Sequence, residues 1–203
     1  MSRGRLAVLL AVLAAVVAAL AYGLQGPSPA PTSSPSLQPL IARAALEPCA
    51  GDLASRSGAH GLIPDVRLPC LDGSGSHDLL STGTRTQPPT VVNVYGSWCG
   101  PCFDEMPLLR RLHMAAGSRL RLVGIDTEDD PRKALLFALD PKVKQTWPAL
   151  RDDDGLVSRA LGGGAPKTVF VDTAGKVVHV QRGFYSSYPA LLADVRRYLG
   201  VSL

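Results

Sequence analysis

The sequence predicts an α/β fold in which helices cover a central sheet. Apolar, β-branched runs at 90–96 and 120–126 are typical of buried strands, and 167–180 predicts two strands around a turn. Helices are predicted for the runs at 101–117, 131–140 and 188–200, the last of which ends before Gly200. Because strands and helices alternate along the chain, the layered α/β class follows.

Residues at the ends of these elements support their boundaries. Pro101 suits the first position of a helix, and Gly117 suits its end. Asp130 followed by Pro131 is typical of an N-cap and a first helical residue. Gly200 lies just beyond the last predicted helix. The expected order is strand, helix, strand, helix, a longer insert, two strands and a final helix.

The chain is expected to consist of three segments, 1–24, 25–48 and 49–203. Residues 6–24 carry neither charge nor proline, and as a helix of roughly 28 Å they would span a bilayer. Arg3 and Arg5 precede this run and place the rest of the chain on the extracytoplasmic side. The sequence thus predicts a single-pass anchor, a Pro/Ser-rich tether and one folded domain. A cleaved signal peptide, with "ALA" at 19–21 as the cleavage site, is the alternative and would give a secreted protein.

Composition excludes some classes of function. The net charge of +4 is mild, and no basic cluster with interleaved aromatic residues is present, which argues against nucleic-acid binding. The apolar content of 46% suits a globular domain rather than a disordered chain. We expect the domain to be a monomer.

Four cysteines follow the apolar segment, in a compartment where disulfides persist. A single C-x-x-C and scattered histidines do not match a structural zinc site, so no metal is expected. The run "RDDDG" at 151–155 lacks the ligand spacing of a calcium loop and predicts a solvated turn. Cys49 and Cys70 are predicted to form a structural disulfide, and a second redox-active pair is the alternative.

The other two cysteines, in "YGSWCGPCFDE", have a spacing that suits redox chemistry. Cys99 would lie at a helix N-terminus, where free N–H groups and the helix dipole stabilise a thiolate. Cys102 lies one turn later and can resolve a mixed disulfide. Gly100 leaves the approach to Cys99 open, and Pro101 fixes the backbone at the helix start. The reaction needs no cofactor beyond the redox-active disulfide.

The segment "VNVYGSWCGPC" resembles the active site of the thioredoxin superfamily, including Trp98 and the Cys-Gly-Pro-Cys quartet. Pro107 matches the proline that lies inside the family's active-site helix. "GGGAPKTVFVD" resembles a second signature, which implies a cis bond between Ala165 and Pro166 and client binding by the backbone before the proline. The resemblance covers residues 60–200.

The apolar N-terminus and tether point to the TlpA/ResA-like branch of that superfamily. This resemblance implies a thioredoxin-like fold, a central mixed β-sheet flanked by helices, with an N-terminal extension and an insert. Classical thioredoxin has a buried Asp where this chain has Asn93. TlpA/ResA-like proteins instead carry a Glu three residues after the second cysteine, which Glu105 matches. Glu105 is therefore expected to tune the pKa values of the cysteines and to help deprotonate Cys102, and an acid that only complements the helix dipole is the alternative. Phe103 stands where relatives carry a basic residue, and it is either part of a docking surface or buried.

By resemblance the chain is a thiol–disulfide oxidoreductase, most simply a protein-disulfide reductase outside the cytoplasm. Its implied partners are disulfide-containing clients such as apocytochrome c and a membrane thiol reductase that supplies electrons. An oxidase or isomerase role is the alternative within the same chemistry. From other classes come a copper metallochaperone, for which His179 would be the added ligand, and a thiol peroxidase, whose threonine-then-cysteine pocket is not seen.

Overall fold

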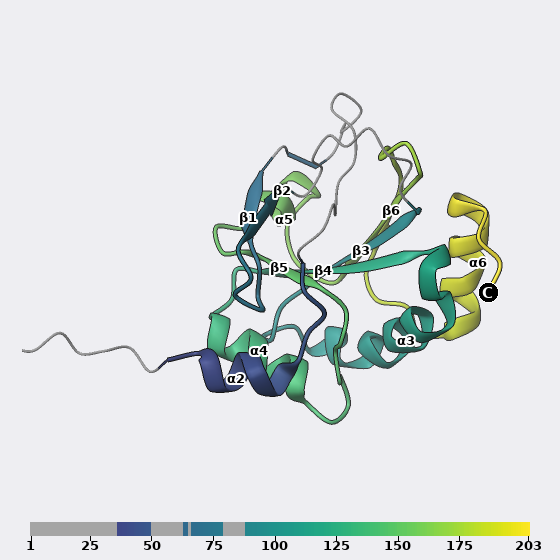
Figure 1. Cartoon of the computed structure of the whole chain (residues 1–203). Helices are drawn as coiled ribbons and strands as arrows, with labels where there is room; N and C mark the ends of the chain where they lie inside the picture. The colour runs from purple at the N-terminus through teal and green to yellow at the C-terminus, as the bar shows by residue number, and fades with distance from the viewer. Residues whose placement is uncertain (1–35, 50–62, 65, 79–87) are drawn as a thin grey trace, which may run out of the picture. The chain divides into compact units, whose positions relative to one another are not determined.

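The structure is a computed structural model that describes residues 36–49, 63–64, 66–78 and 88–203 (Figure 1). In these ranges, no helix combines the length and the apolar character needed to cross a bilayer. The predicted anchor at 1–24 lies outside the described residues.

A five-stranded mixed sheet forms the centre of the domain. Its strands are β3 (Thr90–Tyr95), β4 (Arg121–Thr127), β5 (Ala149–Asp152), β6 (Lys167–Val171) and β7 (Val177–Arg182), in the order β5-β4-β3-β6-β7. β3, β4 and β5 are parallel, whereas β6 and β7 run antiparallel to their neighbours. A separate antiparallel pair consists of β1 (Arg67–Pro69) and β2 (Ser76–Asp78). The predicted α/β class with a mixed sheet is confirmed.

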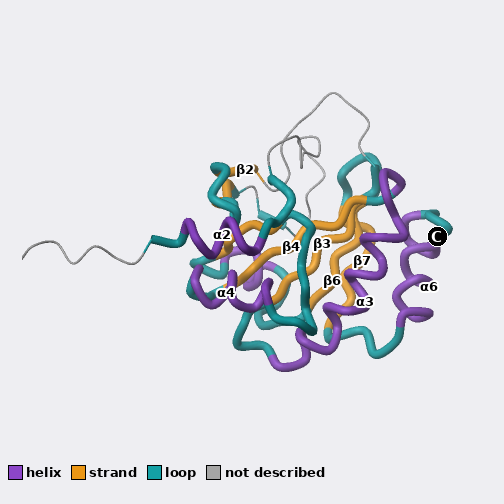
Figure 2. Tube along the Cα trace, turned by 60° about the horizontal axis from the view of Figure 1, so that its bottom comes forward, coloured by secondary structure: helices purple, strands orange, loops and turns teal. Residues whose placement is uncertain are grey.

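Helices cover this sheet. They are α2 (Gln38–Ala44), α3 (Gly100–Ala116), α4 (Pro131–Leu139), α5 (Leu156–Ala160) and α6 (Tyr188–Leu199), with a 3₁₀ turn η1 at Gly117–Arg119. α3 lies beside α6, and α2 lies beside α4, in the views of both Figure 1 and Figure 2. α4 begins at the predicted cap, since the Asp130 side chain accepts hydrogen bonds from the backbone of Arg132 and Lys133. α3 begins at Gly100, one residue before the predicted first position at Pro101.

The central strand β3 is buried on both faces, which is why its sequence is a continuous apolar run. Val91 and Tyr95 pack into one core cluster with the buried residues of α3 and α6. Val92 and Val94 pack into another cluster with apolar residues of β4 and β6. The carboxyl end of β3 therefore leads from the middle of the core directly into α3.

Two predictions about local structure differ from the fold. The sequence predicts an extended tether through residue 48, but Gln38–Ala44 form α2, because Leu40 and Ala44 are buried in a cluster with apolar residues of α4. The "RDDDG" run is only partly a solvated turn. Its Asp152 ends β5, is buried, and accepts hydrogen bonds from the backbone of Val157 and Ser158 at the start of α5.

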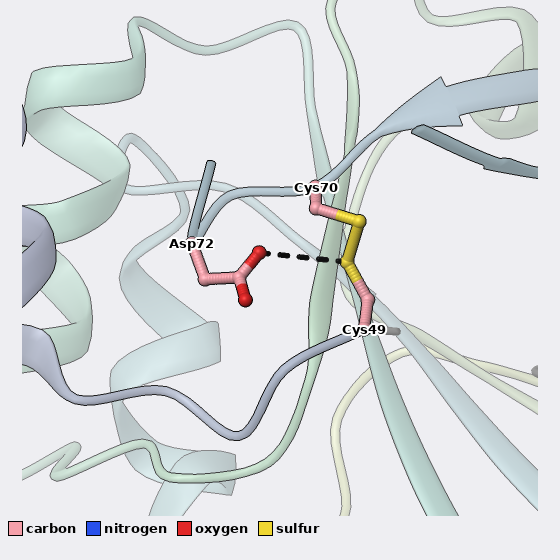
Figure 3. Close-up of side chains that lie close together, drawn as sticks. All are labelled: Cys49, Cys70 and Asp72. Atoms are coloured by element: carbon pink, nitrogen blue, oxygen red, sulfur yellow. Dashed lines mark hydrogen bonds between the residues drawn. A yellow bond between two sulfur atoms is a disulfide. The ribbon is translucent and has the colours of Figure 1, made fainter. Parts of the chain in front are cut away.

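A disulfide joins Cys49, which follows α2, to Cys70, which follows β1 (Figure 3). Both cysteines are buried, and Cys70 forms a backbone bridge with Leu150 of β5. Asp72 points at this bond, with its Oδ1 3.7 Å from Cys49 Sγ. The disulfide therefore fastens the N-terminal part of the domain to the edge of the main sheet.

Candidate active site

Cys99 and Cys102 form a disulfide at the N-terminus of α3, with an S–S distance of 2.06 Å. Cys99 is the N-cap residue in an extended conformation, and the helix begins at Gly100. Both cysteines are buried in this oxidised form, so exposure does not distinguish them. Their places in the helix do, because only Cys99 stands at the end where free N–H groups and the dipole favour an anion.

The loop between β3 and α3 is held from the neighbouring strand β4. Asp129, just beyond that strand, accepts hydrogen bonds from the backbone N–H of Ser97 at 2.5 Å and from its hydroxyl at 2.9 Å. The indole N–H of Trp98 donates to the carbonyl of Thr127 at 3.1 Å. Gly96 leaves room for this ring, since a Cβ there would lie 2.5 Å from Trp98 Nε1. The residue before Cys99 is thus fixed while half of its side-chain surface stays exposed.

Glu105 lies one turn after Cys102 and is buried, which is unusual for a carboxyl group. Its oxygens accept hydrogen bonds from Asn93 Nδ2 at 3.1 Å, from the backbone N–H of Tyr185 at 3.1 Å and from the hydroxyl of Thr168 at 3.4 Å. These donors come from β3, β6 and the loop before α6. A residue that merely complemented the helix dipole at the surface would have no such set of partners.

Burial raises the pKa of Glu105 to about 7, although the three hydrogen bonds act in the opposite direction. Near neutral pH the carboxyl group of Glu105 can therefore either donate or accept a proton. In the unfolded chain Glu105 has the ordinary glutamate pKa of 4.5. Between pH 4.5 and about 7 the folded chain keeps a proton that the unfolded chain releases, so the contribution of Glu105 to stability falls as the pH rises through that interval.

The peptide bond between Ala165 and Pro166 is cis, as the second signature predicts. Ala165 packs against the same apolar cluster that contains Cys99 and Cys102. The carbonyl of Pro166 accepts a hydrogen bond from the backbone N–H of Gly183. The start of β6 is therefore held against the core cluster of the two cysteines, and residues 183–185 connect it to Glu105 through the backbone N–H groups of Gly183 and Tyr185.

Asp126 is another buried acid, and it lies near Asp129, which holds the loop between β3 and α3. It is the register partner of Tyr95 in β3, and its Oδ1 has no hydrogen-bond partner in the described part of the chain. Burial and, next, the carboxylate of Asp129 raise the pKa of Asp126 to about 9. Asp126 is accordingly protonated at neutral pH, so Asp129 meets a neutral acid there rather than a second charge.

Phe103 is half-buried and packs edge-on against Phe137 of α4, with ring centroids 4.5 Å apart. Phe103 is therefore neither fully buried nor fully exposed, and one face of its ring packs on α4. Asp104 forms an ion pair with Lys142 at the surface. Pro107 lies inside α3, where it cannot donate to the carbonyl of Phe103 one turn earlier.

The structure brings several predicted site residues to one place and leaves others apart. One group lies where β3 and β6 meet α3. It consists of Trp98, the Cys99–Cys102 disulfide with Gly100 and Pro101 between its cysteines, the buried Glu105 and the cis bond before Pro166. Sequence reasoning did not identify Asp129, Thr168 and Tyr185. The acidic run "EDD" at 128–130, directly after the buried strand β4, was the one signal for Asp129.

Side chains that could bind a metal come close together at one place in the described ranges. Cys49, Cys70 and Asp72 are the one group there whose ligand atoms all lie within 4.8 Å of one another. With both sulfurs in a disulfide, these cysteines offer no thiolate to a metal. His179 instead stacks on the ring of Tyr198, with centroids 4.0 Å apart.

Comparison with known proteins shows the same fold and chemistry class. The chain matches the Redoxin family over residues 59–192. It is 30% identical over 125 residues to the thiol:disulfide interchange protein DsbE of Escherichia coli, covering 60% of this chain and 63% of that one. It is 48% identical over 48 residues to the thiol:disulfide interchange protein CycY of Rhizobium leguminosarum, covering 24% and 25%. The chain thus spans less than two thirds of the length of these relatives.

Solved structures give a consistent result. The MTB DsbF structure superposes with a TM-score of 0.57 at 26% identity, covering 67% of this chain and 98% of that one. The thiol:disulfide interchange protein DsbE from Chlorobium tepidum superposes with a TM-score of 0.59 at 23% identity, covering 72% and 100%, and supports the fold alone. The chain therefore belongs to the Redoxin family, as a thioredoxin-superfamily protein of the ResA/DsbE type.

Proposed function

We propose that this protein is an extracytoplasmic thiol–disulfide oxidoreductase that reduces disulfides in client proteins through Cys99 and Cys102. The observation that carries the proposal is the disulfide at the N-terminus of α3, next to a buried carboxyl group that titrates near neutral pH. A helix N-terminus stabilises a thiolate, and a neighbouring acid with a pKa near 7 can exchange protons with the pair.

The reaction divides into two exchanges, and each one balances. The Cys99 thiolate attacks one sulfur of a client disulfide, forms a mixed disulfide and releases the other client sulfur as a thiolate. Cys102 then loses its proton and attacks Cys99 Sγ, which releases the second client thiolate. Two electrons pass from the protein to the client, and the Cys99–Cys102 disulfide of the present structure is the product.

We assign to Glu105 the acceptance of the Cys102 proton in the second step. It is the buried acid on the same helix, one turn beyond Cys102, and its pKa of about 7 makes transfer in either direction feasible. Asn93 and Thr168 hold the carboxyl group in place. Asn93 cannot itself titrate, so in this chain the acid of the site lies on the helix rather than on β3.

The client is proposed to bind along the segment before cis-Pro166. Ala165 packs against the apolar cluster that contains Cys99 and Cys102, and its backbone can pair with an extended client chain by strand addition. Trp98, the residue before Cys99, offers the apolar surface of a half-exposed ring. Apocytochrome c, whose paired cysteines must be reduced before haem attachment, is the client class that the resemblance to the ResA/DsbE type favours.

The supply of electrons and the location are part of the same proposal. A reductant consumed by clients needs a donor, and a membrane thiol reductase would deliver electrons to the extracytoplasmic side. The uncharged run at 6–24, preceded by Arg3 and Arg5, supports a membrane anchor with the domain outside. We also assign the Cys49–Cys70 disulfide a structural role, because both sulfurs are buried and a carboxylate faces them.

The reduction potential of the Cys99–Cys102 pair tests the direction of electron flow. We expect a value of roughly −270 mV, similar to that of thioredoxin, because the pair must reduce its clients. Equilibration of the full chain with glutathione buffers, followed by mass mapping of both cysteine pairs, gives this value. A value near roughly −120 mV would make the protein an oxidant of the DsbA kind, and the reductase proposal would fall.

A further inference from the structure

Lys167, the first residue of β6 and the neighbour of cis-Pro166, is only 4% exposed. Lysine is rarely buried to this degree unless its ammonium group is paired. Here Lys167 Nζ donates hydrogen bonds to the backbone carbonyls of Gly163 and Gly164. The side chain therefore turns back on the loop that leads into the cis bond.

That loop has an uncommon backbone. Gly162, Gly163 and Gly164 have φ angles of 96°, 73° and 74°, a conformation that residues with side chains rarely adopt. On one side, Ser158 of α5 holds this loop, since its carbonyl accepts from the N–H of Gly163 and its hydroxyl lies 3.4 Å from the carbonyl oxygen of Gly164. On the other side, the Lys167 ammonium group holds the two carbonyls.

The backbone of Lys167 also contacts the active site. Its carbonyl accepts a hydrogen bond from Asn93 Nδ2, the same amide group that donates to Glu105. Lys167 thus connects the glycine loop, through its side chain, with the network around Glu105, through its main chain.

The charged form of Lys167 is stabilised by the carbonyl groups that accept its hydrogen bonds. Burial and, next, the guanidinium of Arg182, its register partner on β7, lower the pKa of Lys167, while the carboxylate of Glu128 opposes this shift. A cation in such surroundings is stabilised chiefly by charge-assisted hydrogen bonds. The two glycine carbonyls supply them.

We propose that Lys167 is a positioning residue for client capture. By holding the carbonyls of Gly163 and Gly164, it fixes the backbone of Ala165 in the conformation that pairs with the client chain. This inference rests on the proposed function. It assigns to Lys167 an effect on the KM for the client, without an effect on the sulfur chemistry of Cys99 and Cys102.

Lys167→Met tests the proposal, since it keeps an unbranched apolar stem and removes the donor. In single-turnover reactions of the prereduced full-length protein with excess oxidised peptide that contains a Cys-X-X-Cys-His disulfide, KM is the peptide concentration at half-maximal rate and kcat is the maximal rate constant. We expect KM to rise about tenfold, the scale on which lost hydrogen bonds to a charged group act. The kcat, the reduction potential and the thiol pKa of Cys99 should stay unchanged. Lys176→Met, which removes an exposed lysine from a turn, is the matched control and should leave KM unchanged.

Lys167→Arg should recover most of the wild-type KM, because a guanidinium group can donate to both carbonyls. If the Met variant does not fold, Lys167→Gln, which keeps an N–H donor, carries the same measurement, and KM should rise by a smaller factor. An unchanged KM in the Met and Gln variants, or a changed reduction potential at constant KM, overturns the proposal. If the wild-type protein fails to reduce the peptide, the proposed function itself fails, and the two failures are thereby distinguished.

Discussion

Replacing Cys102 with Ser is expected to convert the protein into a trap for its clients. Cys99 would still attack the client disulfide, but no thiol would remain one turn later to resolve the mixed disulfide. Turnover should fall by at least about a thousandfold, the scale seen when a group of the covalent machinery is removed. Non-reducing electrophoresis and mass spectrometry should detect a covalent adduct between the protein and an oxidised client peptide.

Cys99→Ser is the matched control for this experiment. It removes the sulfur at the helix N-terminus, so it should lose turnover to a similar degree and form no adduct. Adduct formation by the Cys99 variant, with none by the Cys102 variant, would reverse the assigned roles. Because both cysteines are buried in the oxidised form, this pair of variants decides a question that exposure alone does not.

The Cys49–Cys70 disulfide is expected to stabilise the folded domain and to have little effect on the reduction of clients. It closes a loop with a sequence separation of 21 residues, so the Cys49→Ser, Cys70→Ser double variant should lose about 3 kcal/mol of unfolding free energy. Urea unfolding of the two oxidised proteins measures the difference. Peptide reduction by the folded variant should match the wild type, since Cys99 and Cys102 are unchanged.

A double variant of Cys99 and Cys102 provides the comparison for that measurement. Its disulfide closes a loop with a separation of only 3 residues, so the loss of stability should be smaller. If the Cys49, Cys70 variant kept full stability but lost turnover, the pair would be a redox partner of the active site, and its structural role would be wrong.

The main elements of the fold could be predicted because their signals are local. β3 is a continuous apolar run, and α4 begins with an aspartate N-cap followed by proline, so neither needs tertiary information. α2 could not be predicted in the same way. It has only seven residues, and it is stabilised by packing of Leu40 and Ala44 against α4, which the sequence places far away.

In the active site, too, residues with a local sequence signal could be predicted, and residues brought together by tertiary packing could not. Cys99 and Cys102 lie in a short motif whose local pattern points to their chemistry, and the role of Pro166 is implied by the resemblance of its segment to the thioredoxin superfamily. The anchor of the active-site loop has no such signal, because Ser97 and Asp129 are 32 residues apart and meet only when β3 and β4 pair. The acceptors of Lys167 are close in sequence, but only the conformation of three successive glycines turns their carbonyls toward it.

The pH titration of the reduced protein, with Glu105→Gln beside it, tests the central claim most directly. That claim is that Cys99 is the nucleophile and that Glu105 governs proton transfer at the pair. Ultraviolet absorbance of the thiolate should show Cys99 ionising below the value of about 8.5 for a free cysteine. Release of a bound client by Cys102 should accelerate as the pH rises through about 7, because Glu105 loses its proton there and becomes able to accept one.

In Glu105→Gln that acceleration should disappear, while the low pKa of Cys99 persists because the helix N-terminus is unchanged. Glu105→Asp would keep an acid on a shorter side chain and should retain part of the pH dependence. The account is contradicted if Cys99 ionises like a free thiol and the Gln variant releases client with the same pH profile as the wild type.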